Sequence, residues 1–152
     1  MIPALESDLT RLLTAARGFK FHAWVDTLRQ RDRHLIVLHT LIASVGNGGF
    51  TQWVNFGYRD HQEPVLRLAL ARFAEHCPAQ RATVTEVLAL IDQTYRVQPD
   101  AGAGLTDEEA DAFDPLDDRF YALSDDFRTG LGEYLRHWQS CRPPSAPAHA
   151  SQ

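Results

Sequence analysis

The fold is decided by the stretch Asn47-Gly48-Gly49-Phe50-Thr51-Gln52-Trp53, where a long apolar run stops and the chain restarts with two aromatic residues. The preceding residues 35–45 place apolar side chains at steps of three, four and three, which predicts a buried helix. Asparagine and glycine readily adopt the backbone conformations that a sharp reversal needs. The stretch therefore predicts a structural corner between two helical segments.

The residues of this corner have separate expected roles. Gly46 is expected to end the buried helix in a left-handed conformation, and Asn47-Gly48 to supply the positive φ of the reversal. Gly49 has no β-carbon, so another segment of the chain can pass close to it. Phe50 and Trp53, three residues apart on a short following helix, are expected to fill the core at the corner.

Helical periodicity extends over most of the remaining chain. It covers residues 5–17, 65–73, 84–95 and 127–138, while residues 21–45 hold either one long helix or two. Three further helix starts are expected from a capping box at residues 106–109, an N-cap and proline at 114–115, and a cap with acids at 124–126. The sequence thus predicts an all-α protein, a single compact domain of about six to eight helices over residues 1–142, with a disordered tail at 143–152.

Composition and charge limit the classes of function. No apolar stretch approaches the roughly 18 residues of a membrane span, and no secretory signal is apparent, so we expect a cytoplasmic protein without membrane contact. The net charge of −5 is uneven, because residues 1–97 carry +2 and residues 98–152 carry −7. This asymmetry argues against direct binding of nucleic acid by the C-terminal part and, if the protein has a charged partner, indicates a basic one.

The sequence lacks the motifs of common catalytic and cofactor sites. Seven histidines include no pair at a spacing of three or four, and no Cys-x-x-Cys or His-Glu-x-x-His occurs, so we expect no metal. There is no Gly-x-Ser-x-Gly elbow, and the glycines at 46–49 lack the lysine of a phosphate loop. We therefore expect neither a cofactor nor catalytic residues.

Acidic residues are concentrated between positions 106 and 126, and they are the candidate site for binding a basic partner. If this segment folds as short helices on one side of the domain, the carboxylates form a negative surface that a DNA-binding protein can accept in place of phosphates. The alternative is local, because a carboxylate in the first turn of a helix is stabilised by the helix dipole without any partner. The candidate residues are Asp107, Glu108, Asp111, Asp114, Asp117, Asp118, Asp125 and Asp126.

Two stretches resemble a known family. The corner has the form Asn-Gly-Gly-Phe-x-Gln-aromatic, and residues 116–126 place acidic pairs on both sides of Phe120-Tyr121. Both resemble the bacterial DNA-mimic family, formally a domain of unknown function, and the resemblance covers roughly residues 20 to 138. It implies an all-α fold and, for at least some members, binding to a DNA-binding protein in place of DNA.

Three functions follow from these observations. The first is a non-enzymatic interaction protein whose acidic C-terminal face binds a basic partner, such as a transcription factor or another DNA-binding protein. The second is an immunity or antitoxin-like protein that covers a basic toxin. The third is a small enzyme that uses polar groups near the corner, namely Gln52, Asn55 and His61.

Overall fold

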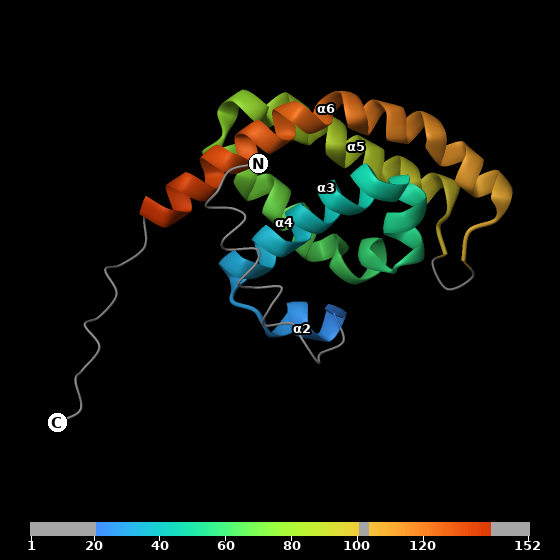
Figure 1. Cartoon of the computed structure of the whole chain (residues 1–152), viewed down its shortest axis with the longest axis horizontal. Helices are drawn as coiled ribbons and strands as arrows, with labels where there is room; N and C mark the ends of the chain where they lie inside the picture. The colour runs from blue at the N-terminus through green and yellow to red at the C-terminus, as the bar shows by residue number, and fades with distance from the viewer. Residues whose placement is uncertain (1–20, 101–103, 141–152) are drawn as a thin grey trace.

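The computed structural model describes residues 21–100 and 104–140, with side chains up to residue 137. The helices are α2 (Phe21–Thr27), α3 (Gln30–Asn55), α4 (Tyr58–His76), α5 (Arg81–Val97) and α6 (Asp107–Ser140), and the 3-10 turn η1 (Pro78–Gln80) precedes α5 (Figure 1). Within these ranges there is no strand, which confirms the all-α prediction. None of these helices combines the length and hydropathy of a membrane-spanning segment.

Helix α3 forms the centre of the molecule. Helices α4 and α6 pack extensively against it and α5 packs against α6, while α2 precedes α3 and contacts the start of α4 through Phe21 and His22 (Figure 1). The segment 34–45 of α3 is buried on nearly all sides, and Leu35, Leu38, Leu41 and Val45 are almost fully buried. Because the helix is interrupted between Thr27 and Gln30, residues 21–45 form two helices and not one.

The predicted corner lies inside α3, with its reversal at Gly48-Gly49, one residue later than the expected Asn47-Gly48. The backbone leaves helical geometry at Gly48 (φ −142°, ψ 19°) and Gly49 (φ 70°, ψ −176°), and helix resumes directly afterwards. The expectation that Gly46 ends the helix and that Asn47-Gly48 supply positive φ is wrong, because only Gly49 has positive φ in α3. Its conformation is one that essentially only glycine adopts, so the reversal is fixed at this residue.

Helix α6 corrects the prediction of three separate helix starts between residues 106 and 126. Only the first exists, where the Glu109 amide donates to Thr106 Oγ1 at 3.2 Å, and the helix then continues without a break to Ser140. Buried side chains recur in one helical register through both expected breaks, so packing against the core overrides the local cap signals. They are Phe113, Leu116, Phe120, Phe127, Leu131 and Tyr134.

The number of helices is lower than predicted for the same reason. Five α-helices lie in the described ranges, against the six to eight expected for the whole chain, because Asp107–Ser140 forms a single helix. Pro115 stays inside this helix on its exposed side, where the missing N–H costs one backbone hydrogen bond without disturbing the core. The helix expected at residues 5–17 and the tail at 143–152 lie outside the described residues.

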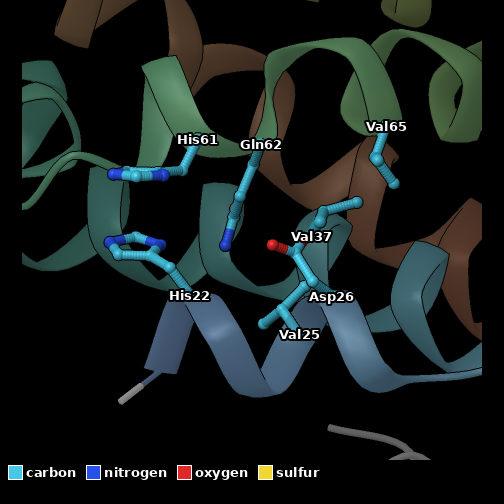
Figure 2. A pocket seen from close by; sticks show the side chains of 7 residues that line it. All are labelled: His22, Val25, Asp26, Val37, His61, Gln62 and Val65. Carbon is cyan, nitrogen blue, oxygen red and sulfur yellow. The ribbon is translucent and has the colours of Figure 1, made fainter.

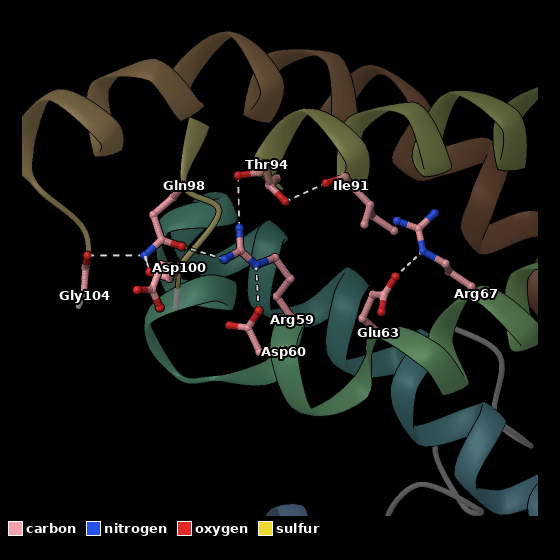
Figure 3. Close-up of polar contacts among 9 residues, drawn as sticks. All are labelled: Arg59, Asp60, Glu63, Arg67, Ile91, Thr94, Gln98, Asp100 and Gly104. Atoms are coloured by element: carbon pink, nitrogen blue, oxygen red, sulfur yellow. Dashed lines mark hydrogen bonds and ion pairs between the residues drawn. The ribbon is translucent and has the colours of Figure 1, made fainter. Parts of the chain in front are cut away.

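A buried arginine joins α4 to the end of α5. Arg59 is fully buried, its guanidinium lies 4.2 Å above the Tyr95 ring, and Nη1 donates to the Thr94 carbonyl at 3.0 Å. Its second Nη donates to Gln98 Oε1, and the Gln98 amide continues to the Gly104 carbonyl at 3.4 Å (Figure 3). The network thereby links α4 to the loop that leads into α6.

Replacement of Arg59 by leucine should destabilise the protein by at least about 2 kcal/mol, because hydrogen bonds from a charged donor contribute roughly 1.5 to 3 kcal/mol each and Gln98 Oε1 loses its donor in a buried position. Urea unfolding followed by circular dichroism measures the change. Arg67→Leu is the control, since Arg67 bonds to Glu63 and Asp92 at a partly exposed position. That variant should lose less than about 1 kcal/mol, and equal losses in the two variants would contradict the role assigned to Arg59.

Candidate functional site

The continuous α6 aligns five exposed aspartates on one helix face. A helix turns 100° per residue, so positions 0, 4, 7, 11 and 18 fall within about 60° of one another and span about 27 Å along the axis. All five side chains are exposed to solvent. We call this row the acidic stripe: Asp107, Asp111, Asp114, Asp118 and Asp125.

Basic side chains do not interrupt the acidic stripe. Residues 107–126 contain nine carboxylates and one arginine, a net charge of −8. That arginine, Arg119, forms an ion pair with Glu86 of α5 at 3.1 Å and donates to Gln93 Oε1 at 3.3 Å, so its guanidinium is directed toward α5. The stripe is therefore a surface of negative charge alone along a little more than the N-terminal half of α6.

The other three predicted binding residues lie off this stripe. Glu108 is exposed on the adjacent face of the helix. Asp126 accepts hydrogen bonds from Thr83 Oγ1 and from Gln80 Nε2 across to α5 and η1. Asp117 is only partly exposed and faces the corner in α3. The structure thus groups five of the eight predicted residues, and partner binding by any of them stays a prediction.

Asp117 holds α6 against the corner. Its Oδ1 accepts a hydrogen bond from the Phe50 amide at 2.7 Å, and its carboxylate lies where a β-carbon on Gly49 would overlap it. Burial raises the pKa of Asp117, the bond from the Phe50 amide lowers it, and nearby Asp114 and Asp118 raise it further. From the sequence, the absence of a β-carbon at Gly49 indicated that another segment of the chain can pass close to it. Nothing in the sequence identified Asp117 as the contacting group.

Tyr121 provides a second contact between α6 and α3 that sequence reasoning missed. Its hydroxyl donates to the Val45 carbonyl at 3.1 Å, while 45% of the residue remains exposed beside the acidic stripe. Desolvation and the carboxylates of Asp117 and Asp118 raise the pKa of this phenol, so it stays a donor at neutral pH. The ring is thus held in one orientation on the same surface as the stripe.

The residues considered for an enzyme site are not brought together. Gln52 lines a cavity beside the corner, whereas Asn55 is exposed at the end of α3. His61 stacks on His22 with ring centroids 4.1 Å apart, next to a separate water-sized cavity that Gln62 also lines (Figure 2). Across the described residues, no group of three or more His, Cys, Asp or Glu side chains is arranged to hold a metal ion.

Comparison with known proteins identifies one family. The family model described as DMP19-like protein matches residues 26–138, which is most of the chain and includes both the corner and the acidic stripe. No curated protein and no solved structure matches.

Replacement of Gly49 by alanine should destabilise the fold by about 1 to 3 kcal/mol from backbone strain alone, and further because the new methyl group overlaps the Asp117 carboxylate. Gly104→Ala is the matched control, because Gly104 also has positive φ but has open space around it. Chemical denaturation of both variants measures the difference. A loss at Gly49 no larger than at Gly104 would show that the contact with Asp117 contributes nothing.

Asp117→Ala should cost about 1 to 3 kcal/mol, because the Phe50 N–H loses its acceptor in a partly buried position. Asp117→Asn keeps an acceptor oxygen and should be close to wild type.

The pKa of Asp117 is raised in the folded state, so its ionisation is less favourable there than in the unfolded chain. The free energy of unfolding of the wild-type protein therefore falls as the pH rises from the unfolded-state pKa to the folded-state pKa of this group. Asp117→Asn should therefore gain relative to wild type between acidic and neutral pH in thermal unfolding, and an opposite trend would refute this assignment.

Proposed function

The chain belongs to the DMP19-like protein family, a family of DNA mimics, and we propose that the acidic stripe of α6 binds a basic DNA-binding protein in place of DNA. The partner's arginine and lysine side chains, which would otherwise contact phosphates, pair with the aspartates of the stripe. The proposed activity is therefore competitive binding and involves no chemical reaction.

The observation that carries this proposal is the continuity of α6 through the acidic segment. Stabilisation of a carboxylate by the helix dipole falls off within the first turn. Asp114, Asp118 and Asp125 lie well inside α6, so neither capping nor the dipole explains them. An exposed row of like charges that stabilises nothing within its own helix is expected where a partner of opposite charge binds.

The dimensions of the acidic stripe support pairing with a DNA-binding surface. Its five carboxylates are separated by about 7 Å on average along the helix axis. Duplex DNA carries one charge per 3.4 Å of each strand, and its binding proteins match this density with arginine and lysine. The stripe therefore offers roughly half the charge density of one strand along about 27 Å, but none of the base edges on which sequence recognition depends.

We predict that Asp111, Asp114 and Asp118 changed together to asparagine weaken partner binding by roughly 10- to 100-fold, because each lost pair contributes about 0.5 to 1 kcal/mol. The matched control changes the exposed acids Asp26, Glu75 and Glu133 to their amides, which alters the net charge by the same amount away from the stripe. Partners are captured on the immobilised protein from a lysate of the source organism, identified by mass spectrometry and titrated at low and high salt. Circular dichroism checks that both variants keep their helix content.

Competition with DNA separates mimicry from other acidic interfaces. Duplex DNA should displace the captured partner from the wild-type protein, and binding should weaken as salt rises because the pairs are exposed. A partner that duplex DNA does not displace from the protein indicates an antitoxin-like interaction instead. Equal binding by the stripe variant and its matched control would reject the acidic stripe as the binding surface.

A further inference from the structure

The corner contains two amide side chains that neither the core nor the acidic stripe uses. Asn47 is exposed and Gln52 is partly buried, in contrast to their neighbours Phe50 and Trp53, which are fully buried. Asn47 Nδ2 donates to Gln52 Oε1 at 3.2 Å, and Gln52 Nε2 donates to Ser44 Oγ at 3.4 Å. These three side chains form a short polar row along α3, from the exposed Asn47 to the buried Ser44, on either side of the reversal.

This polar row lines a cavity of about 340 Å³. The cavity lies between α3 and the N-terminal ends of α2 and α4, which contribute the aromatic rings of Phe21 and Tyr58. These rings meet edge to face with centroids 5.5 Å apart, so they form an apolar wall. Its volume is within the range of roughly 300 to 1,000 Å³ that is typical of sites for small molecules, which are mainly apolar with a few hydrogen-bonding groups.

The described residues that line the cavity carry no formal charge. None of the described residues that line it is Asp, Glu, Lys or Arg. The one titratable group of interest is His39, whose pKa is lowered by burial and by the nearby Arg128 guanidinium, so that its imidazole is neutral at pH 7. A charged ligand would lose hydration beside the aromatic rings, and none of the described lining residues offers it an ion pair, which disfavours it.

The hydrogen-bonding groups favour a ligand with both donors and acceptors on one edge. A side-chain amide has two N–H donors and a carbonyl with two lone pairs, so the contacts within the row leave further donors and acceptors on Asn47 and Gln52. An aromatic wall facing such amides matches a flat ring that carries polar atoms at its rim. We propose that this cavity binds an uncharged, planar heteroaromatic small molecule, with its ring against Phe21 and Tyr58 and its polar edge on Asn47 and Gln52.

The test uses a variant that fills the cavity and leaves the core unchanged. Ala43 is an exposed helical residue that lines the cavity, so Ala43→Phe places a ring in the space of the ligand. Ala71→Phe is the matched control, because Ala71 is also exposed on a helix but does not line the cavity. Both variants retain the acidic stripe, so partner capture remains an independent measurement.

The probe is a panel of uncharged heteroaromatic fragments, purine and pyrimidine bases included, screened against the full chain by ligand-observed NMR. A matched panel carries a carboxylate or an ammonium group on the same rings. We expect uncharged members to bind the wild-type protein and Ala71→Phe, in which the cavity is open, and not Ala43→Phe, in which the new ring fills it. Loss of fragment binding in Ala43→Phe alone supports the site, whereas no uncharged hit, equal binding by the charged panel, or binding retained in Ala43→Phe overturns it.

Discussion

The hydrogen bond from the Phe50 amide to the Asp117 carboxylate joins the two parts of the chain on which the structure depends. It spans 67 residues and holds the middle of α6 against the reversal in α3. The reversal leaves an amide without an intrahelical partner, and α6 supplies the acceptor, because buried backbone donors are almost always paired. Gly49 makes this possible, since any other residue would place a β-carbon at the position of the carboxylate. A corner in one helix and an acid on another are therefore parts of a single contact.

The same contact determines which face of α6 is exposed. Phe113, Phe120 and Phe127 face the core, and Asp117 faces the corner, so the opposite face of the helix is exposed. The acidic stripe lies on that face, and Arg119 turns toward Glu86 at its side. Because the helix is unbroken, the carboxylates have fixed spacings, which three short helices joined by turns would not provide. A rigid row of charge would keep a constant geometry for the proposed partner and would need little ordering on binding.

The acidic stripe and the cavity beside Asn47 differ in electrostatic character, although both adjoin the corner. Asp117 and Tyr121 contact α3 from the α6 side, beside the acidic stripe. Asn47 and Gln52 lie next to the uncharged cavity bounded by α2 and α4. The corner thus helps to position both the acidic stripe and the cavity. This double role accounts for its polar residues, which stand beside the glycines and aromatic rings of the reversal.

The sequence by itself determined the helical class, the corner near Asn47, the burial of Phe50 and Trp53, and the concentration of acids after residue 105. These features depend on local periodicity, on the special conformations of glycine and on composition, all of which are visible in one chain. Only the tertiary structure decided that α6 continues past Pro115 and Ser124, that Asp117 faces inward, and that the reversal lies at Gly49. These outcomes depend on the packing of Phe120 and its neighbours against residues far away in the sequence, and such long-range burial outweighs local cap signals that contribute about 1 kcal/mol or less each.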